Sequence, residues 1–216
     1  MTQEAWTAVD NLLTERFVNP DPVLDAVIAA NSAAGLPAID VSAPQGRFLH
    51  LLARIAGARA ILEIGTLGAY STICLARALP PGGRITTCES NSAHAEVARS
   101  NIASAGLADV VDVRVGPALN TLATLDGPFD FVFIDADKVN NANYVTEAVR
   151  LASPGAVIVV DNVIREGAIV SADPDAAAQA TLAMFTVAAG TDLTATAIQT
   201  VGAKGWDGFL LIRVNS

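Results

Sequence analysis

Two short polar clusters follow apolar runs in the second half of the sequence. Asp135 comes directly after residues 129–134, and Asp161 with Asn162 comes directly after residues 156–160. If these runs are neighbouring parallel strands, Asp135 lies one strand spacing, about 4.8 Å, from the other pair. Three oxygen ligands without Cys or His favour a hard cation, Mg²⁺ first and then Mn²⁺ or Ca²⁺. The spacing therefore predicts a divalent metal site formed by Asp135, Asp161 and Asn162.

Asp and Asn are also common at strand ends and turns, so either cluster alone would be explained as loop capping. Two acids after two of the most apolar runs favour an ion instead, because apolar surroundings leave a carboxylate in need of a charged partner. Lys138, three residues after Asp135, is a candidate general base if a nearby ion and burial lower its pKa. The alternative is a solvated lysine that pairs with Asp137.

A glycine-bearing turn, residues 63–71, follows an earlier apolar run and opens a predicted helix. Glycines at the carboxyl edge of a sheet let a ligand approach the backbone closely. The turn lacks the G-x-G-x-x-G spacing that seats a dinucleotide pyrophosphate. Glu63, two residues before Gly65, would repel a phosphate but suits a cationic or amino-bearing ligand. The turn therefore points away from NAD.

Glu89 ends the next apolar run, where an acid can accept hydrogen bonds from a ribose diol. The alternative is a charge favoured by the dipole of the following helix. Further along, residues 116–118 form a small-residue turn, Gly-Pro-Ala, on which an adenine ring could lie flat.

These residues need a sheet that brings their turns to one edge. From residue 59 onward, short apolar runs alternate with helical stretches, which is typical of a parallel sheet covered on both faces, a doubly wound α/β fold. The predicted strands are residues 60–64, 85–88, 110–115, 129–134 and 156–160. The predicted helices between them are residues 71–79, 92–105, 119–125 and 141–151.

Both ends of the chain extend this pattern. Residues 1–58 read as helices, one beginning at Asp21-Pro22 and ending near Gly35, and one from the capping-box sequence of residues 42–45 to Gly57. The apolar stripe of that second helix is Phe48, Leu51, Leu52 and Ile55. After Asp161, a helix runs from Asp173-Pro174 to Gly190. Two strands follow, residues 193–200 and 208–214, whose short connection requires antiparallel pairing.

Bulk composition narrows the function classes. A chain of 216 residues without an interdomain linker is expected to form one domain, 1–216, with the helical segment 1–58 and a core of 59–216. The net charge of −9 argues against nucleic acid as a partner. Without a membrane-length apolar stretch or a signal-peptide pattern, we expect a cytoplasmic protein. Cys74 and Cys88 are expected to be buried thiols.

Together these motifs resemble the cation-dependent O-methyltransferases, the group that contains catechol and caffeoyl-coenzyme A O-methyltransferases. The resemblance covers nearly the whole chain. It rests on residues 41–49, 63–65, 70–71, 116–118, 133–138, 161–162 and 207–208. It implies a seven-stranded, mostly parallel Rossmann-like sheet of the class I methyltransferase type, with an antiparallel last strand and N-terminal helices.

The resemblance also implies roles for single residues. The S-adenosylmethionine contacts that it implies come from Val41, Glu63, Gly65, Thr66, Ser71, Glu89, Ala118, Asp135 and Asp137. It assigns the metal to Asp135, Asp161 and Asn162, and it makes Lys138 and Asp135 the catalytic residues, with Lys138 as the general base. The implied acceptor is a vicinal-diol phenol of the catechol or caffeoyl type, and the implied assembly is a homodimer.

Three positions depart from the family pattern. Ala69 replaces a glycine before Tyr-Ser, Val41 replaces a hydroxyl residue of the plant enzymes, and Glu166 stands where those enzymes have a substrate-binding asparagine. The third departure puts the plant substrate in doubt. We expect the loop 164–172, the N-terminal segment and Trp206 to border the acceptor site, with Trp206 packing near the final strand rather than on substrate.

Other functions remain open at this point. A tRNA-modifying methyltransferase of the same family is disfavoured by the acidic composition. A nicotinamide-dependent oxidoreductase is disfavoured by the missing pyrophosphate fingerprint. A binding module without turnover is disfavoured by the complete set of metal ligands.

Overall fold

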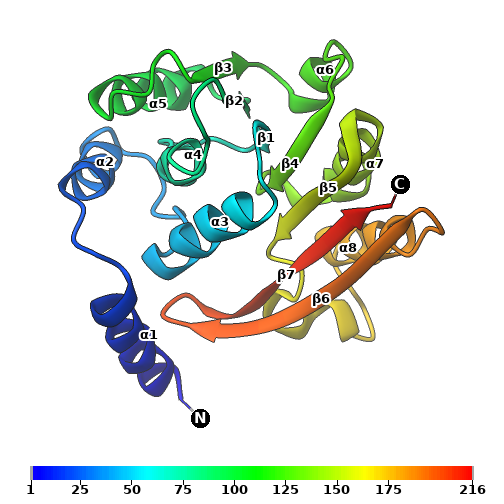
Figure 1. Ribbon diagram of the computed structural model, residues 1–216. Helices are drawn as coiled ribbons and strands as arrows, with labels where there is room; N and C mark the ends of the chain where they lie inside the picture. Colours follow the sequence, from blue (N-terminus) through cyan, green and yellow to red (C-terminus); the bar gives the residue numbers. More distant parts are fainter. Residues whose placement is uncertain (1, 216) are drawn as a thin grey trace.

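The apolar runs form the strands that they predict. A computed structural model describes residues 2–215, and in it one seven-stranded sheet has the order β3-β2-β1-β4-β5-β7-β6 (Figure 1). The strands are β1 (Ala60–Ile64), β2 (Arg84–Glu89), β3 (Val111–Val115), β4 (Phe129–Ile134), β5 (Ala152–Asp161), β6 (Leu193–Gly202) and β7 (Gly205–Val214).

Strand directions confirm the predicted architecture. The pairs among β1 to β5 are all parallel, whereas β7 is antiparallel to both β5 and β6. The chain winds outward from β1 to β3 on one side and from β4 to β5 on the other. In an open α/β sheet, ligands bind outside the carboxyl ends of the strands at such a switch point, here between β1 and β4.

Several predicted boundaries are wrong by two to four residues. The helices predicted at residues 71–79 and 119–125 end at residues 76 and 122. β5 begins at Ala152 rather than at residue 156, because its first residues pair with Phe129 across an irregularity in the ladder. The β6–β7 ladder continues to the pair Gly202 and Gly205, so the last hairpin is longer than predicted. The extension of β5 is Ala-Ser-Pro-Gly and that of the hairpin contains Gly202 and Gly205, residues that resemble loop sequence, and only cross-strand pairing makes them strand.

The helices cover both faces of the sheet. They are α1 (Gln3–Phe17), α2 (Pro22–Ala33), α3 (Ala43–Ile55), α4 (Tyr70–Ala76), α5 (Ser92–Ser104), α6 (Ala118–Leu122), α7 (Asn141–Leu151) and α8 (Ala176–Ala188), with short 3₁₀ turns η1 (Lys138–Asn140) and η2 (Arg165–Val170). In Figure 1, α3, α4 and α5 lie on one side of the strands, and α6, α7 and α8 lie on the other.

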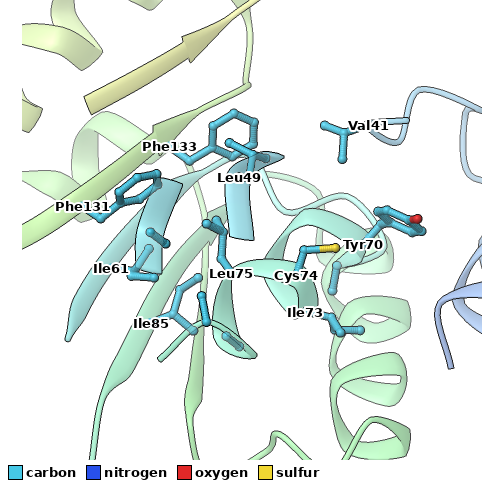
Figure 2. Packing of buried hydrophobic residues seen from close by; sticks show 14 of the residues in the cluster. Val41, Leu49, Ile61, Tyr70, Ile73, Cys74, Leu75, Ile85, Phe131 and Phe133 are labelled. Atoms are coloured by element: carbon cyan, nitrogen blue, oxygen red, sulfur yellow. The ribbon is translucent and has the colours of Figure 1, made fainter. Parts of the chain in front are cut away.

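Each face has its own hydrophobic core because strand residues alternate between faces. Ile61 and Phe131 belong to the core under α3, α4 and α5, which Figure 2 shows in close view, with Leu49 and Leu75 coming from the helices. Their neighbours, including Leu62, Val132 and Ile158, belong to the second core under α7 and α8. Cys74 and Cys88 are buried and free, as predicted.

Helix α3 shows a different buried face from the predicted one. Leu51 and Ile55 are 46% and 81% exposed, whereas Leu49 and Ala53 are buried. Gly46 is the reason, since a Cβ there would press against Cys74 and the ring of Tyr70. The small residues let α3 approach α4 closely. A pattern based on large apolar residues misses that contact.

Helix α1 contains no buried residue and lies beside the turn of the β6–β7 hairpin (Figure 1). Gln3 Nε2 donates to the carbonyl of Gly202 at 2.9 Å, and Asp10 Oδ2 accepts from the backbone N–H of Ala203 at 2.7 Å. The helix and the hairpin turn therefore support one another. Among the described residues, no helix has the length and apolar character needed to cross a membrane.

Candidate active site

A cavity of about 970 Å³ opens at the carboxyl edge of the sheet, at the switch point between β1 and β4. Its volume is in the range of pockets that hold small molecules and cofactors. Every predicted site residue except Glu63 lines it: Val41, Gly65, Thr66, Ser71, Glu89, Ala118, Asp135, Asp137, Lys138, Asp161 and Asn162.

Asp135 follows β4 and Asp161 is the last residue of its parallel partner β5, so both lie at the strand ends that the sequence predicts. Asp161 is only 7% exposed, and burial together with the charge of Asp135 raises its pKa to about 6. Lys138 Nζ donates to Asp135 Oδ1 at 2.6 Å, and within residues 2–215 no other lysine forms an ion pair with either acid. The floor of the cavity therefore carries two carboxyl groups, Asp135 and Asp161, and the single ammonium of Lys138 does not neutralise both.

The backbone explains how these groups come so close. Gly65 has φ +103°, and a Cβ there would collide with the carbonyl oxygen of Asp135. The glycine thus permits β4 to end directly beside the turn that follows β1. Asn162 adopts φ 58°, a left-handed conformation that Asn tolerates better than most residues.

The donor set fits a hard divalent cation. Asp161, Asp135 and Asn162 offer only oxygen among their usual metal-binding atoms, and a positive ion stabilises a buried carboxylate such as Asp161 with a second acid beside it. Within the described chain no three His, Cys, Asp or Glu side chains form a ligand group. A cation at this place would therefore depend on the amide oxygen of Asn162 as its third protein ligand.

Asp161 also receives two hydrogen bonds that hold its carboxylate. Its Oδ1 accepts from the backbone N–H of Asn162 at 2.9 Å. Its Oδ2 accepts from Gln45 Nε2 at 2.6 Å. Gln45 lines the cavity but is absent from the set predicted as site residues.

Glu63 lies one layer below the cavity and is fully buried. Ser71 and Thr87 donate to its two oxygens at 2.7 Å each, and Thr72 donates to Oε2. Because Thr87 donates its one hydroxyl proton to Glu63, Thr66 must be the donor in the 2.6 Å contact between the two threonines. Burial raises the pKa of Glu63 to about 7. Glu63 therefore connects to the cavity through the hydroxyls of Ser71 and Thr66.

This burial predicts a pH-dependent stability. The pKa of Glu63 rises from an ordinary 4.5 to about 7 on folding, so its contribution to stability is fully present below pH 4.5 and is lost as the pH rises through 7. The free energy of unfolding should thus fall by up to about 3 kcal/mol across that window. In Glu63→Gln, which has no carboxyl to ionise, this part of the decline should disappear.

Urea denaturation of both proteins at several pH values, in EDTA and without ligand, measures the difference. Asp161 is present in both proteins, so its own titration cancels in the comparison. A parallel decline in wild type and variant would contradict the raised pKa of Glu63.

Glu89 fastens the turn that follows β1. Its Oε2 accepts from the backbone N–H of Leu67 at 2.8 Å, and its Oε1 accepts from that of Asn91 at 2.9 Å. Leu67 and Ala69 both have positive φ angles, 49° and 73°. Ala69 thus occupies a conformation that glycine adopts without strain, which gives a physical reason for the usual glycine there. Glu89 holds this strained turn while its side chain borders the cavity.

Asp137 is held within its own loop. Its carboxylate accepts from the hydroxyl of Tyr144 and from Asn140 Nδ2. Burial raises the pKa of the Tyr144 hydroxyl, and the hydrogen bond that this hydroxyl donates to Asp137 raises it further.

Ala118 is the first residue of α6 and comes directly after the turn that contains Gly116, whose φ of +134° favours glycine.

The acceptor side of the cavity differs from the expectation. None of the residues 164–172 lines it. The turn of the β6–β7 hairpin does, through Thr200, Val201 and Lys204, together with Asp10 of α1. Asp207 holds residues 164–165 in place by accepting from both backbone N–H groups. Trp206 packs against Gly167 and donates to Gln199, so, contrary to the expectation, it does not border the cavity.

Known proteins are similar to this chain in sequence and in fold. A family model described as O-methyltransferase matches residues 15–213. A catechol O-methyltransferase of Mycobacterium tuberculosis is 59% identical over 210 residues, which cover 95% of this chain and 94% of that protein.

Two solved structures superimpose closely on this chain. The O-methyltransferase of Bacillus cereus, in complex with SAH, has a TM-score of 0.96 at 49% identity, covering 99% of this chain and 100% of that one. TomG of Streptomyces achromogenes, an O-methyltransferase of tomaymycin synthesis in complex with SAM, has a TM-score of 0.96 at 49% identity and covers 100% of both chains.

Proposed function

We propose that this chain, which belongs to the O-methyltransferase family, methylates one hydroxyl of a vicinal-diol phenol. S-adenosylmethionine is the methyl donor of this reaction, and a divalent cation assists it. The observation that carries the proposal is the pair Asp135 and Asp161, held beside Asn162 at the floor of the cavity. The mycobacterial relative is a catechol O-methyltransferase, which supports a catechol as acceptor. Membership of the O-methyltransferase family argues against a nicotinamide-dependent oxidoreductase.

The methyl donor would occupy the part of the cavity bordered by β1, β2 and the turns after them. S-adenosylmethionine supplies a methyl group on a sulfonium, an electrophile that needs an oxygen nucleophile in line with it. Gly65 lets the turn after β1 lie directly against the backbone of Asp135 at the edge of the cavity, and Glu89 presents a carboxylate to a ribose diol. The acidic residues around this part of the cavity suit a ligand that carries positive charge.

The acceptor would bind over Asp135, Asp161 and Lys138. A bound cation supplies Lewis-acid stabilisation of an ionised hydroxyl and a template for two adjacent oxygens. Asp161 is held by Gln45 and by its own turn, so its carboxylate is already oriented. Lys138 Nζ donates to Asp135 Oδ1 at 2.6 Å, which holds it beside the acceptor; once Nζ has lost a proton, its lone pair can accept the proton of the reacting hydroxyl.

A panel of acceptors tests the proposal directly. Catechols, caffeoyl esters and matched monophenols are incubated with S-adenosylmethionine, with added Mg²⁺ or with EDTA, and methylated products are measured by mass spectrometry. We expect products only from vicinal diols and only with metal. Equal methylation of monophenols, or full activity in EDTA, would contradict the proposed substrate class or metal dependence, respectively.

Replacing Glu89 tests the cofactor end of the cavity. Glu89→Ala removes two hydrogen bonds to a ribose diol, and bonds to charged groups are worth about 1.5–3 kcal/mol each. The affinity for S-adenosylhomocysteine, measured by calorimetry, should therefore fall at least about tenfold. Glu96→Ala, an exposed glutamate of helix α5, which follows β2, is the matched control and should bind as wild type does. An unchanged dissociation constant in Glu89→Ala would refute the ribose role.

A homodimer remains part of the proposal. Helix α1 has no buried residue and exposes Leu12 and Phe17, and α3 exposes Leu51 and Ile55. Apolar surface of this kind supports a second subunit as its cover. A cytoplasmic location also stays a prediction.

A further inference from the structure

Gln45 does not make the local bond that its position predicts. The sequence Ser42-Ala43-Pro44-Gln45 has the form of a capping box, in which the fourth side chain bonds back to the backbone N–H of the first residue. Half of that box forms, since Ser42 Oγ accepts from the backbone N–H of Gln45 at 3.3 Å. The side chain of Gln45 instead crosses to Asp161, a residue 116 positions away, at 2.6 Å.

A second contact holds α3 at the same place. Phe48, one turn after Gln45, packs its ring on Phe209, with centroids 4.9 Å apart. Phe209 is the register partner of Asp161 in the β5–β7 ladder. Helix α3 is thus docked beside Asp161 by an aromatic contact, and Gln45 uses that docking to reach the carboxylate.

We propose that Gln45 is a positioning residue that orients Asp161 for a divalent cation through the hydrogen bond from its Nε2. The inference rests on the proposed function, because it assumes that Asp161 is a metal ligand. A neutral amide suits this task, since it can donate a hydrogen bond to one carboxylate oxygen without placing a positive charge where the metal ion would bind. Lys138, which holds Asp135, carries a charge that a metal ion would have to displace or repel.

Without the bond, Asp161 would keep only its contact to the neighbouring backbone N–H. A carboxylate with one constraint samples more orientations, and binding of the ion would then have to select one of them. Partners of ligating carboxylates commonly contribute about 10–100-fold to metal affinity for this reason. Val41, in the segment just before α3, also lines the cavity, on its proposed cofactor side. Helix α3 and the segment before it therefore border both the proposed metal site and the proposed cofactor site.

The test measures Mn²⁺ binding to the full-length protein by calorimetry and by the electron paramagnetic resonance of free Mn²⁺, without acceptor. Gln45→Met keeps the length of the side chain and removes the donor, and Gln45→Ala removes both. We expect Mn²⁺ affinity to fall about 10–100-fold in each variant. Affinity for S-adenosylhomocysteine in EDTA and the thermal midpoint should match wild type. Saturating Mn²⁺ should bring turnover on a catechol back toward wild type.

The controls separate this inference from the proposed function. Gln179→Met changes a glutamine of α8 that bonds only to the carbonyl of Pro174, and it should bind Mn²⁺ as wild type does. If Asp161→Ala loses Mn²⁺ while Gln45→Met and Gln45→Ala retain wild-type affinity, the role of Gln45 is overturned and the metal site stands. If wild type and Asp161→Ala bind Mn²⁺ equally, both the metal site and the role of Gln45 are wrong.

Discussion

Asp161→Ala should lose nearly all methyl transfer at ordinary Mg²⁺ concentrations, by at least about 10³-fold, because Lewis-acid stabilisation by a catalytic metal is worth several kcal/mol. The substitution removes one of three proposed protein ligands and a buried negative charge. Excess Mg²⁺ or Mn²⁺ should restore part of the rate, since the two remaining ligands still attract a cation. Chelation of the wild-type protein with EDTA should abolish turnover in the same way.

Binding of S-adenosylhomocysteine should survive both treatments, because Glu89 and Ser71 are distinct from the proposed metal ligands. Calorimetry with S-adenosylhomocysteine therefore shows whether the variant is folded. Asp173→Ala, an exposed aspartate of the chain, is the matched control and should keep wild-type turnover. Full activity of Asp161→Ala, or of wild type in excess EDTA, would remove the support for a metal at this place.

Lys138→Met should lower turnover on a simple catechol by about 10²–10⁴-fold, the usual cost of losing a positioned proton acceptor. Its failure should differ from that of Asp161→Ala. Lys138 is an ammonium 2.6 Å from Asp135 Oδ1, so its removal leaves Asp135 without a competing positive charge. Mn²⁺ should then bind at least as tightly as in wild type, and extra metal should not restore the rate.

Two conditions should restore the rate of this variant instead. Raising the pH ionises the diol without a base, and a nitro-substituted catechol has a lower pKa and needs a base less. The ratio of wild-type to variant turnover should therefore shrink with the nitro-substituted catechol. If Lys138→Met keeps wild-type turnover on an unactivated catechol near neutral pH, Lys138 only pairs with Asp135 and takes no part in proton transfer.

The site could be predicted largely from strand ends. Parallel strands place their carboxyl ends at one edge of a sheet, so polar residues at or directly after the ends of β1, β2, β4 and β5 must meet there. Asp135, Asp161 and Glu89 follow this rule and line the cavity. Strand β1 and helix α7 have the predicted bounds, because continuous apolar runs and helical spacing are strong local signals.

Glu63 marks the limit of that reasoning. The sequence places it on β1 beside the cofactor turn, but a strand residue can face either the cavity or the layer below it. The three hydroxyls that approach Glu63 come from α4 and β2, and their arrival depends on how those elements pack. Only the tertiary structure decides that Glu63 is buried below the lining.

The sequence by itself thus determined the succession of the sheet strands and their connecting helices along the chain and the antiparallel pairing of the last two strands. It also determined the group of acids at the sheet edge. All of these follow from local periodicity and short connections. The tertiary structure alone decided which face of α3 is buried, that the hairpin turn rather than residues 164–172 lines the cavity, and that Gln45 reaches Asp161. The physical reason is that such contacts join residues far apart in the chain. Close approaches at small residues such as Gly46 and Gly65 allow them, and no spacing within a single element encodes that approach.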